Sequence, residues 1–333
     1  MKGHGADQGN DGGSPIKASV IVVSYNCRDY LLKCLESMFN RTRIRDVEWI
    51  VVDNASTDGT PKEVERRYPQ VRLIKNERNE GFARANNQGV LCARGEYLFL
   101  VNPDVEFLDD CIGNLCRFMD DNPGVGLCGP RILNADGTVQ HSCRKLPTLW
   151  NNLCFALGLH RLFPRSSWFS NELMSYFDHG SRREVEALSG CFLAVRRAAI
   201  QGAGPLDERF FMYSEDVDLC RRLRDRGWKI VFNPETEAVH HGGKSSEKVS
   251  VPSAVQQERA ILQYWEKHHT RLETTLILGI LLMRHVLRFL KAGVIYILGN
   301  RQKASGILAK DAACIKSALT VKMRAGKTAP ADR

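Results

Sequence analysis

The first 120 residues alternate between short apolar segments and amphipathic segments, and this alternation constrains the fold more than any other feature of the chain. The apolar segments are rich in β-branched residues and too short to be buried helices, which predicts strands at 18–24, 48–53, 71–75 and 97–101. Apolar residues recur at helical spacing between them, which predicts helices at 29–40, 60–68 and 82–93. Such a pattern predicts an α/β fold with a Rossmann-like, mostly parallel central sheet flanked by helices.

The second of these helices, 60–68, has a recognisable start. Thr60 is expected to be its N-cap, with Pro61 in the first turn and Glu63 three residues after the cap. Ligands of doubly wound sheets bind beyond the carboxyl ends of the strands. The polar residues that directly follow three strands are therefore expected to line one crevice: Ser24, Tyr25 and Asn26; Asp53 and Asn54; Asn102 and Asp104.

Two of these acids have specific chemical interpretations. Asp53 either closes an Asx-type turn or accepts hydrogen bonds from a nucleobase or ribose. Asp104 has no basic neighbour in the sequence and suits a hard divalent cation such as Mg²⁺ or Mn²⁺, or else belongs to a helix cap near Asp109. A divalent cation at this position would neutralise a departing diphosphate.

A third acidic segment is followed later by a histidine pair. Glu215, Asp216 and Asp218 begin an expected helix directly after an apolar run, 210–213, which suits general-base chemistry, although acids at a helix start also complement the helix dipole. His240 and His241 follow another expected strand, and either imidazole could complete an oxygen-rich metal site. Between these features, 140–186 lacks regular periodicity and is interpreted as a segment near an acceptor, and 185–195 predicts a pair of strands.

Taken in order, these segments resemble the family 2 glycosyltransferases of the GT-A fold, and within them the bacterial rhamnosyltransferase-like members. The resemblance covers about residues 18–246 and is carried by VIVVSYN (20–26), VVDNASTDGT (51–60), NEGFARANNQG (79–89), LVNPDV (100–105), LSGCFLAVRR (188–197), DERFFMYSEDVDLCRRLRDRGW (207–228) and AVHHGGKSS (238–246). The family's D-x-D metal motif stands here as Asn102-Pro103-Asp104, so Asp104 supplies its carboxylate.

The resemblance implies a role for each matched residue. The implied catalytic residues are Asp216, as the base, and Glu215; the metal ligands are Asp104 and His240, with His241 as the alternative register. The implied nucleotide-binding residues are Ser24, Tyr25, Asn26, Asp53, Asn54, Gly81, Arg84, Asn86 and Asn102. The acceptor side is expected to be formed by Gly190, Cys191, Met212 and Tyr213.

The reaction that the resemblance implies is an inverting, metal-dependent transfer from a nucleotide-diphosphate sugar. The expected donor is dTDP-rhamnose, with UDP-galactose, UDP-glucose and UDP-N-acetylglucosamine left open. The expected acceptor is a lipid-linked or growing saccharide in bacterial cell-surface polysaccharide biosynthesis.

Domain boundaries follow from composition. A disordered tail is expected at 1–16, a GT-A domain at 17–250 (a nucleotide-binding half, 17–120, and an acceptor and catalytic half, 121–250), a helical region at 251–321 and a second disordered tail at 322–333. Within the helical region, the longest apolar run without a charge, 274–283, is too short to span a bilayer. With Arg284, Arg288 and Lys291 at helical spacing, the segment is expected to lie on a membrane surface, or alternatively to close the domain as a core helix.

Charge and cysteine usage limit the other classes of protein. A formal net charge of +9 permits nucleic acid, anionic lipid or a phosphorylated substrate as partner. The late basic residues are interleaved with apolar ones, and no nucleic-acid-binding motif is visible. A nucleic-acid- or membrane-binding protein without catalysis is therefore kept only as the alternative class. The absence of G-x-G-x-x-G after the first strand argues against a dinucleotide-dependent oxidoreductase, and a glycosidase would not consume a sugar nucleotide. Eleven cysteines without a C-x-x-C pair, and a first segment without an apolar core, favour the cytoplasmic face of a bacterial inner membrane.

Overall fold

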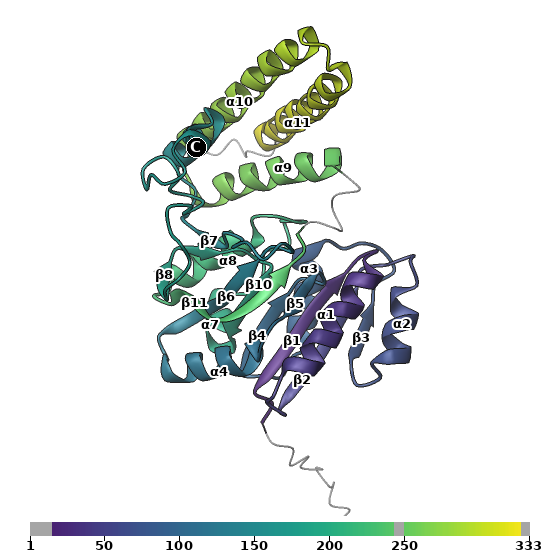
Figure 1. The fold of residues 1–333 in the computed structure, drawn as a ribbon. Coiled ribbons are helices and arrows are strands. Elements are labelled where there is room, and N and C mark those ends of the chain that lie inside the picture. The colour runs from purple at the N-terminus through teal and green to yellow at the C-terminus, as the bar shows by residue number, and fades with distance from the viewer. Residues whose placement is uncertain (1–14, 243–249, 328–333) are drawn as a thin grey trace, which may run out of the picture.

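The computed structural model describes residues 15–242 and 250–327, and its centre is a nine-stranded sheet (Figure 1). The first four strands are parallel to one another in the order β3-β2-β1-β4. Their bounds are β1 Ala18–Ser24, β2 Val47–Asp53, β3 Arg72–Lys75 and β4 Tyr97–Val101. The helices between them are α1 Arg28–Arg41, α2 Thr60–Arg67 and α3 Phe82–Cys92. The alternation predicted for the first half of the chain is confirmed.

The start of α2 differs from the prediction by one residue. Gly59 occupies the N-cap position with φ +85°, and Thr60 is the first helical residue. The hydroxyl of Thr60 donates to Oδ1 of Asp58 at 2.5 Å, so it does not accept from the first turn as a capping threonine would. A left-handed backbone conformation at the cap suits glycine.

The second half of the sheet is mixed rather than parallel. From β4 the order continues β10-β6-β11-β5, where β10 runs antiparallel to both neighbours and β11 runs parallel to β6. The bounds are β5 Val105–Phe107, β6 Val125–Leu133, β7 Cys143–Arg144, β8 Arg183–Val185, β9 Ala187–Leu188, β10 Phe192–Arg196 and β11 Lys229–His240. The helices are α4 Cys111–Asp121, α5 Leu149–Ala156, α6 Leu159–Leu162, α7 Arg197–Ala203 and α8 Glu215–Arg224. Strands occur in the segment 185–195 as predicted, but they do not pair with each other: β8 pairs with β11, β9 with β7, and β10 with β4 and β6.

Both faces of the sheet are buried. Along β1, Val20 and Val22 belong to the core on one face, and Ile21 and Val23 to the core on the other. A strand covered on both faces needs apolar side chains at every position, which explains the unbroken β-branched run in the sequence.

Three helices follow the sheet: α9 Ser250–His268, α10 Arg271–Ile297 and α11 Arg301–Lys327. In Figure 1, α9 lies between the sheet-containing body and the pair formed by α10 and α11. The backbone of α11 continues to Lys327, past residue 321 where the helical region was expected to end. None of the helices within 15–242 and 250–327 is long and apolar enough to cross a membrane. The expected 1–16 tail lies almost entirely outside the described residues.

Two of the basic residues that recur at helical spacing on α10 contact the neighbouring helices. Arg284 donates to Glu258 of α9 at 3.0 Å, and Arg288 donates to Asp311 of α11 at 3.0 Å. His285 lies between the same two carboxylates, 2.8 Å from Glu258 and 3.1 Å from Asp311. Arg284 and Arg288 thus pair with acids that are distant in sequence, and the expected contact of this segment with a membrane surface stays a prediction.

Candidate functional site

The parallel strands bring the predicted polar residues to one edge of the sheet. β1 lies between β2 and β4, with Ser24 opposite Asp53 and Val22 opposite Val101. Neighbouring strands lie about 5 Å apart, so the ends of β2 and β4 are roughly 10 Å apart at this edge. Asp53 and the Asn102-Pro103-Asp104 turn therefore border the same crevice.

Asp53 combines both interpretations that its sequence allowed. Its Oδ2 accepts from the backbone amide of Ser56 at 2.9 Å, which is a local turn contact. Its Oδ1 is buried and has no hydrogen-bond partner among the described residues. A buried carboxylate oxygen without a partner is costly, so this atom is suited to accept from a ligand such as the N–H edge of a nucleobase.

Three residues predicted to contact the nucleotide are turned into the protein. Ser24 is fully buried, with its hydroxyl 3.3 Å from the Cys27 thiol. Asn54 donates to Asn79 and Gly81 and accepts from Asn76 and Glu80, so its side chain is saturated. Asn86 is buried and donates to the carbonyl of Phe82 in its own helix. The place of these three residues in the nucleotide site stays a prediction, and their side chains are engaged within the protein.

The remaining residues of this half shape the crevice. Tyr25 is exposed, and the Asn26 side chain accepts from the amide of Thr57 at 2.8 Å, which holds the turn after β2 against the turn after β1. Gly81 has φ +86°, and a Cβ there would lie 2.6 Å from the carbonyl oxygen of Phe211. Glycine at this position thus allows the loop before α8 to approach the donor half. Arg84 is half-exposed, with Glu80 at 3.4 Å.

Asp104 and His240 form a pair that suits a cation. The amide nitrogen of Gln140 donates to Asn134 at 2.8 Å, which turns its oxygen toward Nδ1 of His240 at 2.7 Å. This nitrogen of His240 must therefore carry a proton, and in the neutral ring Nε2 has the lone pair. Nε2 faces Oδ1 of Asp104 at 3.2 Å. Two neighbouring ligands of one Mg²⁺ lie about 3 Å apart, so the pair fits a shared cation.

His241 is engaged elsewhere. Its Nε2 lies 2.8 Å from Oε1 of Glu106, and its ring packs against Tyr30 with centroids 5.5 Å apart. Of the two histidines that the sequence left open as the metal ligand, the geometry favours His240. No cluster of three or more His, Cys, Asp or Glu side chains suited to a metal occurs in the described part of the chain. Two protein ligands supplemented by substrate phosphates are typical of Mg²⁺ sites.

Asp216 is held at the start of α8 by backbone amides. Its Oδ2 accepts from Gly190 at 2.7 Å and its Oδ1 from Val217 at 2.8 Å. The segment that contains Gly190 is joined in turn to the metal-motif turn, since the amide of Asn102 donates to the carbonyl of Cys191 at 2.9 Å. Asp104 and Asp216 are thereby brought to the same region, from strands and helices far apart in sequence.

Cys191 is not available to an acceptor. Its thiol is buried, and its pKa is raised to about 12, first by burial and then by the charges of Asp104 and Asp216. The expected place of Cys191 on the acceptor side stays a prediction, and its side chain is buried.

The two adjacent acids differ in how strongly they hold a proton. Burial raises the pKa of Asp216, although the amides of Gly190 and Val217 and the charge of Arg144 oppose this. The pKa of Glu215 is raised well above its usual range, first by burial and then by the charge of Asp216. Glu215 therefore keeps its proton when Asp216 has lost its own, which favours Asp216 as the base and Glu215 as a neutral neighbour.

The loop before α8 has an unusual backbone. Tyr213 and Ser214 are consecutive residues with φ +75° and φ +66°, although neither is glycine. Left-handed non-glycine residues cost of order 1–3 kcal/mol each and gather at functional sites. Met212 and Tyr213 are half-buried here, beside the base.

Two further residues of the site carried no signal in the sequence. Gln140 orients His240, and Arg144 places positive charge near Asp216. Both lie in the stretch without periodicity, and their contacts depend on how that stretch folds back over the sheet.

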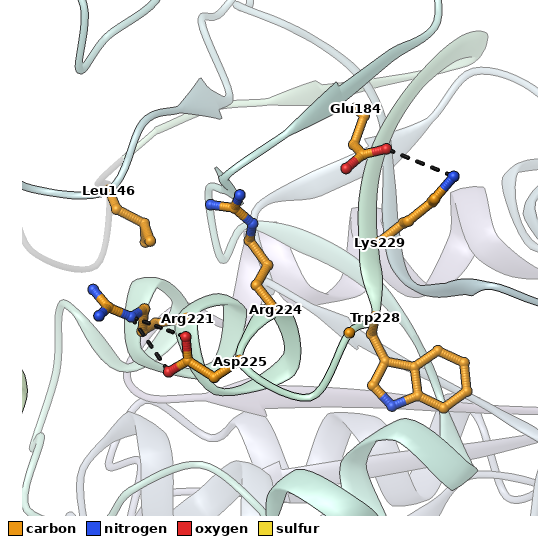
Figure 2. Close-up of a pocket in the computed structure, with 8 residues that line it drawn as sticks. Leu146, Glu184, Arg221, Arg224, Asp225, Trp228 and Lys229 are labelled. Atoms are coloured by element: carbon orange, nitrogen blue, oxygen red, sulfur yellow. Dashed lines mark hydrogen bonds and ion pairs between the residues drawn. The ribbon is translucent and has the colours of Figure 1, made fainter.

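A surface cavity of about 450 Å³ lies at the other end of α8 (Figure 2). It is lined by Leu146, Glu184, Arg221, Arg224, Asp225, Gly227, Trp228 and Lys229. Arg221 is paired with Asp225 at 3.2 Å, and Lys229 with Glu184 at 3.9 Å. The cavity contains none of the predicted site residues, and its charges largely pair with one another.

Comparison with known proteins identifies the family. The model of the family described as glycosyl transferase family 2 matches residues 19–201. The chain belongs to glycosyltransferase family 2. This glycosyltransferase is 36% identical over 239 residues to the N-acetylglucosaminyl-diphospho-decaprenol L-rhamnosyltransferase of Mycobacterium tuberculosis, covering 68% of this chain and 76% of that one. It is 25% identical to the rhamnosyltransferase WbbL of Escherichia coli, covering 67% and 82% of the two chains.

Solved structures show the same fold. The glycosyltransferase superposes on the mannosyltransferase PcManGT from Pyrobaculum calidifontis, in complex with GDP-Man and Mn²⁺, with a TM-score of 0.53, 18% identity, and coverage of 93% of this chain and 79% of the other. A second match is GalNAc-T7 with UDP, GalNAc and Mn²⁺, with a TM-score of 0.51, 16% identity, and coverage of 67% and 43%. The predicted GT-A fold is confirmed, with a C-terminal helical extension.

Proposed function

We propose that this protein transfers rhamnose from dTDP-rhamnose to a polyprenyl-diphosphate-linked saccharide, with inversion at the anomeric carbon. The observation that carries the proposal is the convergence of three acids at one edge of the sheet: Asp53 with a buried oxygen lacking a partner, Asp104 facing His240, and Asp216 fixed by Gly190. The names of the two rhamnosyltransferase relatives support the sugar, and the name of the mycobacterial relative supports a lipid-linked acceptor.

The mechanism follows from the positions of the side chains. Asp53 accepts from the base of the donor nucleotide, and Arg84 borders the nucleotide at the mouth of the crevice. Asp216 takes the proton of the acceptor hydroxyl while that oxygen bonds to the anomeric carbon. The bond from this carbon to the diphosphate oxygen breaks, and its electron pair leaves with the diphosphate. Attack opposite the leaving group inverts the configuration, and no covalent sugar–enzyme intermediate is needed.

Asp104 and His240 would hold a divalent cation, Mg²⁺ or Mn²⁺, with Gln140 fixing the imidazole tautomer. A cation there supplies charge neutralisation for the departing diphosphate. Mn²⁺ in the two matched structures supports a divalent cation for this fold.

We also place the protein at the cytoplasmic face of the bacterial inner membrane, in peripheral contact with it, in the biosynthesis of a cell-surface polysaccharide. A polyprenyl-linked acceptor presents its saccharide at a membrane surface, and the helices from α9 onward adjoin the acceptor half of the domain.

A donor screen tests the proposal. The purified protein would be incubated with Mn²⁺, a polyprenyl-diphosphate-linked N-acetylglucosamine acceptor, and dTDP-rhamnose, UDP-galactose, UDP-glucose or UDP-N-acetylglucosamine in turn. We expect dTDP-rhamnose to be consumed at least about tenfold faster than the others, as expected when pocket contacts discriminate by more than 1.4 kcal/mol. Preference for a UDP-sugar would support glycosyl transfer but contradict rhamnose as the donor sugar. Salt-sensitive DNA binding without consumption of any donor would contradict the proposal of glycosyl transfer.

A further inference from the structure

The exposed side of α10 is apolar along its whole length. The side chains that face the other helices include Ile277, Leu281, His285 and Ala292. On the opposite side, two groups of apolar residues spaced about one helical turn apart are exposed: Leu272 and Leu276 near the start, and Val286, Leu290, Val294 and Ile297 in the second half. Exposed fractions of 64% for Leu290 and 83% for Ile297 show that no other part of the described chain covers this side. We call these six residues the outer stripe of α10.

Apolar side chains lie on both sides of α10, unlike in a helix at the surface of a water-soluble domain. Its side toward α9 and α11 contains the Arg284, His285 and Arg288 contacts with buried acids, and its outer side carries leucine, valine and isoleucine. An ordinary surface helix buries its apolar residues and exposes its charges. Contiguous exposed apolar surface of this kind marks an interaction site.

A second exposed apolar group lies on the segment that packs against α10. α5 contacts α10, and the chain from α5 through α6 exposes Trp150, Phe155, Leu162, Phe163 and Trp168. Trp150 and Trp168 are held together, with ring centroids 5.7 Å apart and the indole N–H of Trp150 donating to the carbonyl of Trp168 at 3.0 Å. Tryptophan and phenylalanine with basic neighbours are typical of segments that insert at a membrane–water interface.

The positive charge around both exposed apolar segments favours an anionic lipid bilayer as the partner. No acidic residue occurs from 146 to 171 or from 274 to 310, whereas the exposed residues there include Arg161, Arg165, Lys291, Arg301 and Lys303. A surface made to pair with a second copy of itself would place like charges together. Apolar side chains fringed by arginine and lysine fit acyl chains beneath anionic headgroups.

We infer that the outer stripe of α10 and the exposed aromatic residues of α5–α6 form one face that docks on an anionic lipid bilayer. This deepens the proposed function and rests on it only for the identity of the acceptor. The face is joined to the reaction centre through one core cluster, which packs Ile277, Leu278 and Leu281 of α10 with Phe210 and brings Tyr213 and Val217, beside Asp216, against it. Docking therefore places the acceptor side of the site next to the bilayer that holds a lipid-linked acceptor.

Vesicle co-sedimentation tests this inference and needs neither donor nor acceptor. The full-length protein would be mixed with phosphatidylglycerol–phosphatidylethanolamine vesicles and with phosphatidylcholine vesicles. A triple variant, Leu276→Glu with Leu290→Glu and Ile297→Glu, removes three apolar contacts and adds three negative charges, so we expect it to bind the anionic vesicles at least about tenfold more weakly. Trp168→Ser should weaken binding on its own, because it removes one interfacial aromatic side chain.

The matched control is Leu91→Glu on α3, where the leucine is 85% exposed but lies in the donor half. It should bind vesicles as the parent does, and equal melting temperatures and donor binding would show that all variants fold. Vesicle binding by the triple variant equal to that of the parent would overturn the inference. A second result would also overturn it: the parent does not bind vesicles and is a dimer by light scattering, whereas the triple variant is a monomer. A second copy of the chain would then cover the face.

Discussion

The backbone amide of Gly190 donates a 2.7 Å hydrogen bond to Oδ2 of Asp216, and the two residues are also in van der Waals proximity. A Cβ on residue 190 would lie 3.1 Å from Cβ of Asp216 and 3.2 Å from its Oδ2. The turn after β9 thus fixes both the position and the hydrogen bonding of the proposed base.

Gly190→Ala should displace this carboxylate. We expect kcat to fall about 10- to 100-fold, because a shift of the base by roughly 1 Å is enough for such a loss, while the donor KM changes little. Gly124→Ala is the control, since a Cβ at Gly124 meets nothing within 4 Å. Steady-state kinetics would contradict the positioning role if both variants behaved like the parent.

The metal site should depend on His240 and Gln140 but not on His241. Gln140→Leu removes the acceptor that fixes the imidazole, so Mn²⁺ affinity should fall about 10- to 100-fold, as for other outer-sphere partners of metal ligands. His240→Ala should weaken Mn²⁺ at least as much, and His241→Ala should leave it within a few-fold. Calorimetric titration of Mn²⁺ in the presence of dTDP measures the affinity of all three variants. A larger loss of affinity in His241→Ala than in His240→Ala would show that His241 is the ligand instead.

The pH dependence should separate the two adjacent acids. Asp216 acts as a carboxylate, and burial raises its pKa, so kcat/KM should fall as the pH is lowered through a value above the usual aspartate value of about 4. The pKa of Glu215 is raised well above its usual range by burial and by the charge of Asp216, so Glu215→Gln, which mimics the protonated form, should retain activity within about tenfold. A rate profile flat down to pH 4, or an inactive but folded Glu215→Gln protein, would argue against this assignment.

Asp218 should be a stability residue rather than a catalytic one. It is fully buried and accepts from Arg222 at 2.8 Å and His268 at 2.7 Å, with Lys267 at 2.6 Å, so it ties α8 to α9. Asp218→Asn leaves buried cations without their counter-charge and should cost about 3–5 kcal/mol. The control Asp225→Asn breaks a more exposed pair with Arg221 and should cost less than about 1 kcal/mol.

The sign of the pH effect follows from the pKa of Asp218. Burial alone would raise this pKa, but the hydrogen bonds from His268, Lys267 and Arg222 outweigh it, and the pKa is lowered. The contribution to stability is therefore present above the unfolded pKa of about 3.9 and is lost as the pH falls through the folded value. Thermal melts should show the difference between the parent and Asp218→Asn narrowing below about pH 4, and a difference that grows there would contradict the account.

The sequence allowed the nucleotide-binding half of the fold to be predicted because its signals are local. β-branched runs such as 18–24 and the polar residues after them identify strands and the edge where they end. The direction in which a side chain points at a strand end is set by tertiary contacts, which is why Ser24 and Asn54 were assigned to the nucleotide although they are buried. The ion pairs of Arg284 and Arg288 could not be predicted for the same reason, since Glu258 and Asp311 lie on other helices.

The central claim is that Asp216 is the base of a donor site bounded by Asp53 and Asp104, and Asp216→Asn tests it most directly. dTDP-rhamnose binding by calorimetry and single-turnover transfer to a lipid-linked acceptor would be measured on the same preparation of parent and variant. The account predicts donor affinity within about twofold and transfer slowed at least about 100-fold, the usual contribution of a general base. Transfer at the parent rate would contradict it.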